Sequence, residues 1–162
     1  MNIFILDYNP TNCARMHADK HVVKMVLETA QILSTALHSL GVEHSGYRST
    51  HVNHPCCRWA RDLRNWVWLR KLGRELGKEY TFRFGKEHAS VAVINKLPIP
   101  EVTVALPRTW AIACPTEYHV YKQEDELTFG IDPIPTYQLF YASKADRFDL
   151  NYTKRNKPDW LN

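Results

Sequence analysis

Apolar positions between residues 10 and 40 recur at spacings of three and four, the period of a helix with one buried face. Asn9-Pro10 is typical of a helix start, with Asn as the cap and Pro at the first helical position, and Gly41 is typical of an end. The pattern therefore predicts one long helix over 10–40. Its buried stripe contains Val22, Val26, Ala30, Leu33 and Leu37.

The same pattern predicts a second long helix and then a less regular region. The second helix is expected to begin at Pro55 and to run to about Arg83, closed by Gly85, with a shorter helix over 86–95. Prolines break regular structure across 96–135, and 135–145 is an aromatic helical segment. We expect a mostly α fold, a single compact domain over 1–162 built on two long packed helices, with an irregular C-terminal half.

The charge is concentrated on the second helix. The chain carries a net charge of +4, yet 58–86 alone holds nine basic and three acidic side chains. A run of charge on a helix usually marks a solvated face, but this excess of one sign favours contact with nucleic acid. The candidate phosphate-binding residues are Arg58, Arg61, Arg64 and Lys71.

Cysteine usage and hydropathy bear on the cellular compartment. Cys56 and Cys57 are adjacent, and the four cysteines form no recognisable disulfide framework, so reduced thiols are expected. Residues 1–10 contain an apolar run of only four residues, and no stretch approaches the length of a membrane span. We expect a cytoplasmic protein, bacterial or in a phage-infected host, that makes no membrane contact.

Two kinds of reactive site remain open alternatives. His17 and His21 are four residues apart on a helix, and His51, His54, Cys56 and Cys57 cluster after a polar loop, but this spacing matches no standard zinc site. Cys56 or Cys57 at a helix start would have a lowered pKa, which suits a nucleophile, although a buried, inert cysteine is the default interpretation. Glycine motifs that cradle phosphates are absent. No metal or cofactor is therefore expected.

A polar face on the first helix is the strongest indication of chemistry. His21, Lys24, Glu28 and Gln31 lie along one side of an otherwise apolar helix. Such a face is often only a solvated surface, but a glutamate set between a histidine and a lysine is also a candidate general acid or base. Glu28 is thus the candidate catalytic carboxylate, with His21 and Lys24 beside it.

Three segments of the chain resemble the pyrimidine-dimer DNA glycosylases, the UV-repair enzymes of T-even phages and their relatives. DKHVVKMVLETAQILSTA is similar to their first long helix, in which an Asp-x-His start precedes a glutamate nine residues after the Asp, as Asp19, His21 and Glu28 do here. NHPCCRWARDLRNWVWLRKLGREL is similar to their second, and TYQLFYASKA to their aromatic C-terminal segment. The resemblance covers about half of the chain, in the same order.

The resemblance implies a glycosylase and abasic-site lyase that attacks the sugar with its own N-terminal amine. Mapped here, the amine of Met1 would be the nucleophile and Glu28 the proton-transfer and charge-stabilising group. An α-amino group, with an ordinary pKa of about 8, is partly neutral at physiological pH. His54 would orient the substrate, and Gln31, Tyr137, Tyr141 and Lys144 would contact nucleic acid.

This chain departs from the family's pattern near the reacting groups. Asn2 should hinder removal of Met1, and Leu27 and Gln31 stand where the family has arginines. We therefore expect a substrate among damaged or modified bases in DNA, exposed by kinking or flipping. The alternatives are an enzyme of the same fold acting on a free or cyclic nucleotide, or a phage protein that binds a nucleotide or a host factor without turnover.

Overall fold

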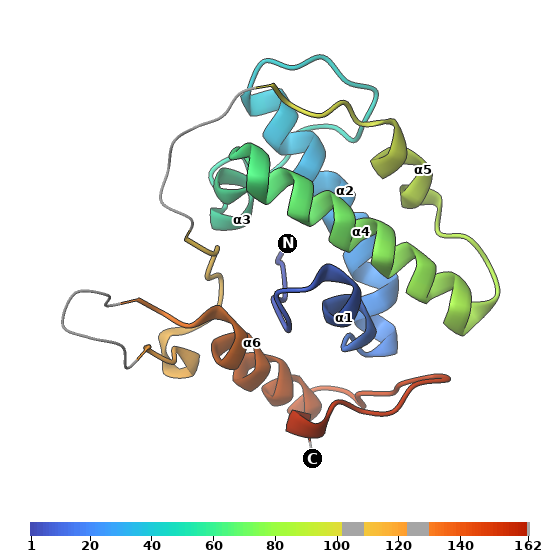
Figure 1. The fold of residues 1–162 in the computed structure, drawn as a ribbon, viewed down its shortest axis with the longest axis vertical. Coiled ribbons are helices and arrows are strands. Elements are labelled where there is room, and N and C mark those ends of the chain that lie inside the picture. Colours follow the sequence, from blue (N-terminus) through green and yellow to red (C-terminus); the bar gives the residue numbers. More distant parts are fainter. Residues whose placement is uncertain (102–108, 123–129, 162) are drawn as a thin grey trace.

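The computed structural model describes residues 1–101, 109–122 and 130–161. This part of the chain is mostly helical, and its two long helices, α2 (Asp19–Ser39) and α4 (Leu63–Phe84), pack against each other. Figure 1 shows them crossing, with α5 (Ala89–Lys96) alongside both. The predicted mostly α fold with two long packed helices is confirmed.

The first predicted helix is in fact two. A short helix, α1 (Pro10–Arg15), starts at the Asn9 cap as expected, and α2 begins only at Asp19. The break has a tertiary cause, because the Ala18 N–H donates to the Tyr141 hydroxyl at 2.7 Å and the Asp19 N–H donates to the Asn151 carbonyl at 2.8 Å. Partners far along the chain thus satisfy backbone groups that a continuous helix would pair internally.

The second predicted helix is also divided. The chain forms α3 (Pro55–Trp59), turns through Ala60 and Arg61, and restarts as α4. Asp62 is the reason, since its carboxylate accepts hydrogen bonds from the N–H groups of Arg64 and Asn65 and caps the new helix. Gly85 ends α4 with a left-handed φ of 70°, which a glycine adopts without strain.

Close helix packing depends on two glycines of α4. A Cβ at Gly73 would meet Thr29 of α2 and Ile94 of α5 at 2.7 and 2.8 Å, and a Cβ at Gly77 would overlap Val91 of α5. The absence of side chains at these two positions lets α2, α4 and α5 approach closely. They enclose the main core, which the buried Trp66 fills from α4.

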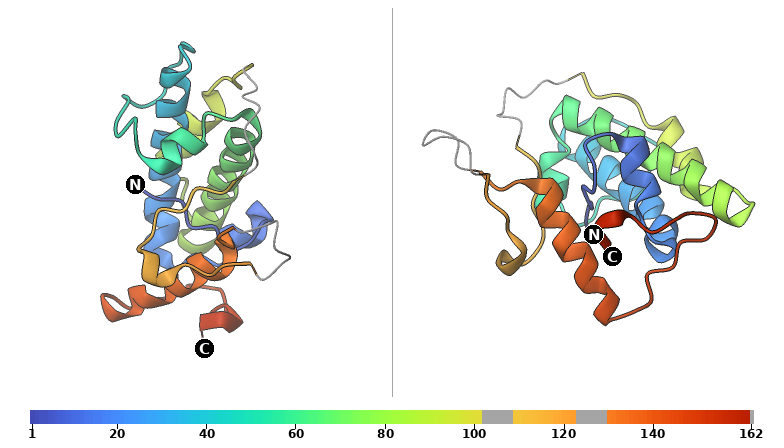
Figure 2. Two further views of the ribbon diagram at one scale, coloured as in Figure 1. Left: turned by 90° about the vertical axis from the view of Figure 1, so that its left-hand side faces the viewer. Right: turned by 60° about the horizontal axis from the view of Figure 1, so that its bottom comes forward.

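The C-terminal half is irregular, as predicted, and wraps the helical core. It contains the short 3-10 turns η1 (Thr116–Tyr118), η2 (Ser143–Asp146) and η3 (Asp159–Leu161), and the helix α6 (Pro133–Ala142). The described residues hold one isolated antiparallel bridge, between Tyr121 and Ile131. Figure 2 shows α6 lying across one end of the helical core. No helix in the described ranges is long and apolar enough to cross a membrane.

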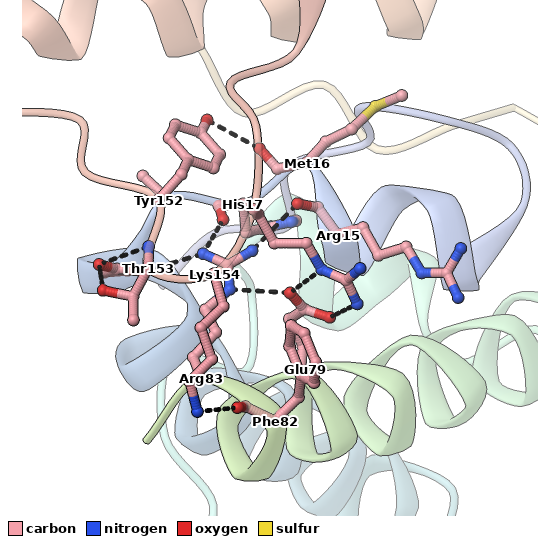
Figure 3. A network of polar contacts seen from close by, with 12 residues as sticks. Arg15, Met16, His17, Glu79, Phe82, Arg83, Tyr152, Thr153 and Lys154 are labelled. Carbon is pink, nitrogen blue, oxygen red and sulfur yellow. Dashed lines mark hydrogen bonds and ion pairs between the residues drawn. The ribbon is translucent and has the colours of Figure 1, made fainter. Parts of the chain in front are cut away.

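A buried ionic cluster ties the C-terminal tail to α1, α2 and α4 (Figure 3). Arg83 of α4, 2% exposed, donates to Glu79 at 2.8 Å, to Asp19 at 3.0 Å and to the carbonyls of Arg15 and His17. Arg155 of the tail donates two hydrogen bonds, of 2.8 and 2.9 Å, to the same Glu79 carboxylate. The cluster fastens residues 152–155 over the break between α1 and α2.

Candidate functional site

The first residues of the chain are anchored in the core. Ile3, Phe4, Ile5 and Leu6 are buried and extended, which agrees with an anchored end rather than a strand. Asn2 precedes them, and its side chain joins several parts of the fold. Its amide donates to the Ala113 carbonyl at 3.0 Å, and its Oδ1 accepts from the Tyr137 hydroxyl of α6 at 3.3 Å and from the Cys56 thiol of α3 at 3.7 Å.

Glu28 lies directly against this anchored end. Glu28 is 7% exposed, and its Oε2 accepts a hydrogen bond of 2.9 Å from the backbone N–H of Asn2. Its Oε1 forms an ion pair of 3.1 Å with Lys24, one turn earlier on α2. The backbone nitrogen of Asn2 is therefore the group that bonds Glu28, and the amine of Met1 lies one residue before it.

A pocket of about 270 Å³ opens beside these groups. Met1, Glu28, His21 and Lys24 line it, together with Phe4 and with residues of the C-terminal half that include Lys144. The pocket thus brings together all four candidate catalytic residues, from the N-terminus and from one face of α2. Gln31, one turn further along α2, is half-buried and does not line the pocket.

His21 is held as a neutral hydrogen-bond donor. The Tyr141 hydroxyl accepts a hydrogen bond from the Ala18 N–H. Because buried polar hydrogens are normally bonded, we assign the hydroxyl proton of Tyr141 to a hydrogen bond with His21 Nδ1, 2.7 Å away. His21 then carries its proton on Nε2. Burial, with smaller contributions from His17 and Lys24, lowers the pKa of His21 to about 3. At neutral pH this imidazole can donate a hydrogen bond but does not act as a charged acid.

His54 and the adjacent cysteines lie on the other side of the N-terminus. His54 caps α3, its Nδ1 accepting from the Cys56 N–H at 3.2 Å. Burial lowers the pKa of His54, and so does the charge of the N-terminal amine. The structure agrees with inert cysteines and not with a nucleophile, because burial raises the pKa of Cys57 and raises that of Cys56 to about 12. Both are free, buried thiols and not activated nucleophiles.

The four predicted phosphate contacts separate into two groups. Arg58 and Lys71 are exposed on α3 and α4, whereas Arg61 donates to the Val52 carbonyl at 2.8 Å and Arg64 pairs with Asp62 at 3.2 Å.

Lys144, also predicted to contact nucleic acid, lines the pocket beside Glu28.

The stacking role predicted for Tyr137 and Tyr141 is wrong, because both residues are 0% exposed and their hydroxyls form hydrogen bonds inside the protein. Their aromatic character serves the core.

Sequence reasoning missed three residues of the site. Asn2 was treated only as an obstacle to processing, yet it holds the N-terminus in place. Arg147 and Phe148 line the pocket from the turn after α6. No local pattern signals them, because their position depends on how α6 docks against α2; the only available hint was a polar residue directly before a buried apolar run.

Comparisons with known proteins identify no relative of this chain. The chain matches no protein-family model, no curated protein and no solved structure. Within 1–101, 109–122 and 130–161, no three His, Cys, Asp or Glu side chains are grouped so as to hold a metal ion. What the arrangement offers chemically is a buried carboxylate, a terminal amine nearby, a neutral imidazole donor and several cations around one small pocket.

Proposed function

We propose that the protein is a DNA glycosylase and abasic-site lyase acting on damaged or modified bases. The observation that carries the proposal is the 2.9 Å hydrogen bond between Glu28 Oε2 and the Asn2 nitrogen, which fixes the beginning of the chain beside a nearly buried carboxylate. Pre-positioned reacting groups account for a large part of enzymatic rate enhancement. The ties from Asn2 to Ala113, Cys56 and Tyr137 give this end of the chain a defined place.

The proposed chemistry uses the terminal amine as nucleophile. Its lone pair attacks C1′ of the sugar, the bond from C1′ to the base breaks, and the base leaves with the electron pair and takes up a proton. The bond from C1′ to O4′ then breaks as the nitrogen loses a proton and O4′ takes one up, which opens the sugar ring and gives an imine between the amine and C1′. Glu28 stabilises the positive charge that develops on the sugar and then removes a proton from C2′, and the 3′ phosphate leaves with the electron pair. Water finally hydrolyses the imine and releases the amine.

The remaining candidates have supporting roles in this scheme. His21 would donate a hydrogen bond from Nε2 to an oxygen of the sugar or phosphate, and Lys24 would orient the Glu28 carboxylate through their 3.1 Å contact. His54 would orient the amine from the side of α3. Exposed Arg58 and Lys71 would attract the strand through its phosphates.

Covalent trapping tests the proposal. The protein is incubated with DNA that carries an abasic site, borohydride is added, and the adduct is located by peptide mass spectrometry. We expect an adduct on the amine of the first residue, Met1 or, if Met1 is removed, Asn2, whose nitrogen then lies 2.9 Å from Glu28. Glu28→Gln should abolish trapping, and Glu75→Gln, which alters a pair with the exposed Lys78 and does not line the pocket, should not. An adduct on Lys24, or none at all, would refute the mechanism.

A further inference from the structure

The pocket beside Glu28 carries an excess of positive charge that the proposed chemistry does not use. Its walls contain three cationic side chains, Lys24, Lys144 and Arg147, and Glu28 is the single carboxylate among its described lining residues. Lys24 is already paired with Glu28. Lys144 and Arg147 come from the C-terminal half of the chain.

Local structure brings Lys144 and Arg147 to the same side. They are three residues apart across η2, and in a 3-10 turn side chains at this spacing are eclipsed. The Lys144 carbonyl accepts from the N–H groups of Arg147 and Phe148 at 3.0 and 3.2 Å, which holds the turn. Burial lowers the pKa of Lys144, and the charges of Arg147 and Lys24 lower it further, as expected for cations gathered around one space.

Lys24 pairs with Glu28, but the Lys144 amine rests on an aromatic ring. Lys144 Nζ lies 3.6 Å from the centre of the Phe140 ring, and Lys20 Nζ lies 4.6 Å from that of Phe148. Such contacts orient an ammonium group without neutralising it, so its charge remains available to an anion. A cationic and partly aromatic pocket suits a ligand that has both a phosphate and a planar ring.

The volume limits the size of the ligand. At about 270 Å³ the pocket lies below the range of roughly 300–1,000 Å³ that is usual for sites of drug-sized ligands. It therefore has room for a single nucleotide and not for a base pair. A nucleotide whose phosphate meets Lys144 and Arg147 would place its sugar toward Glu28 and the N-terminus, because all of these groups line the same space.

From these observations we infer that Lys144 and Arg147 form a phosphate site, with Lys24 at its edge, and that the pocket recognises one unpaired nucleotide through its phosphate. The inference rests on the proposed function for the orientation of the sugar, but the phosphate site itself does not depend on turnover. It predicts that free nucleoside monophosphates bind the protein and compete with DNA for the same pocket.

Calorimetric titration of the full chain tests the phosphate site. Thymidine 3′-monophosphate, thymidine 5′-monophosphate, inorganic phosphate and thymidine are compared on the unaltered protein. We expect at least one monophosphate to bind at least tenfold more tightly than thymidine, and the better isomer shows which phosphate of a strand is read. If thymidine binds as tightly as both monophosphates, the inference is wrong, and this comparison needs no variant.

Variants then assign the site. Lys144→Gln and Arg147→Gln should each weaken monophosphate binding by roughly ten- to a hundredfold, the range for a hydrogen bond to a charged group. Lys96→Gln, an exposed lysine at the end of α5 that does not line the pocket, should leave binding unchanged. Unchanged binding in both pocket variants, with folding verified by circular dichroism, would overturn the assignment.

Competition separates this inference from the proposed function. If the monophosphate binds and blocks borohydride trapping of abasic DNA, both stand. Binding without any trapping retains the phosphate site and refutes the lyase, whereas trapping that saturating monophosphate does not reduce retains the lyase and refutes the shared pocket.

Discussion

The buried arginine of α4 allows a quantitative test of how the C-terminal tail is attached. Arg83→Met keeps much of the side-chain volume but removes four donated hydrogen bonds, two to the carboxylates of Glu79 and Asp19 and two to the carbonyls of Arg15 and His17. Removal of one partner from a buried ion pair typically costs about 3–5 kcal/mol. Because Arg155 still holds Glu79 through two bonds, we expect a loss near the lower end, about 3 kcal/mol.

Urea denaturation followed by circular dichroism measures this loss. The matched control is Lys78→Met on the same helix, since Lys78 is exposed and its 2.7 Å pair with Glu75 should contribute about 0–1 kcal/mol. A loss of about 3 kcal/mol is a large share of the 5–15 kcal/mol that stabilises a typical domain. If Arg83→Met costs no more than the control, the reasoning about the buried cluster is refuted.

The same cluster predicts an acid-sensitive component of stability. Burial alone would raise the pKa of Glu79, but hydrogen bonds from Arg155 and Arg83 outweigh it and lower the pKa; bonds from Thr153 and Arg83 do the same for Asp19. A carboxyl whose pKa is lower in the folded state stabilises the fold fully above its ordinary pKa of about 4 and loses that contribution as the pH falls through the lowered value. Arg83→Met should therefore show a shallower loss of stability below about pH 4.

Four further predictions follow from individual contacts. Gly77→Ala should destabilise the protein by about 1–3 kcal/mol in urea, because the new Cβ overlaps Val91 and forces α5 away from α4; a neutral result would show that α5 shifts freely. Tyr141→Phe should cost about 1–3 kcal/mol, since it leaves the Ala18 N–H and His21 Nδ1 without their partner, and equal stability would argue against that link. Burial lowers the pKa of His17 to about 4, so stability should be full above about pH 6.5 and fall by about 3 kcal/mol as the pH drops to 4; His17→Gln should flatten this decline, and an unchanged slope contradicts it. DNA affinity should fall steeply between low and moderate salt in a filter-binding assay, and flat binding would show that the basic side chains of α3 and α4 contact no phosphates.

Hydrophobic spacing was sufficient to predict the helical architecture but not where the helices break. The recurrence of Val22, Val26, Ala30 and Leu33 identifies the buried face of α2, since that pattern is local. The interruption before Asp19 is not local, because the Tyr141 hydroxyl that accepts from Ala18 comes from 123 residues away. Asp62 shows the opposite case: a capping residue within an apparently continuous pattern is readable from sequence and was overlooked.

The candidate site was partly accessible from sequence for the same reason. His21, Lys24 and Glu28 share a helix face, so their proximity follows from spacing alone. The misassigned pair, Tyr137 and Tyr141, shows the limit of composition, because an aromatic residue is equally suited to a core and to a stacking surface. Their burial is decided by the docking of α6, which no local pattern records.

The geometry of Glu28 therefore depends on the whole fold and not on α2 alone. Asn2, whose N–H meets Glu28, is held by Tyr137 of α6, Cys56 of α3 and Ala113 of the connecting segment. A change that loosens α6 would release Asn2 as well as the turn that carries Lys144 and Arg147. The carboxylate, the beginning of the chain and the cationic wall should thus be lost together when α6 undocks, even though α2 and α4 remain packed.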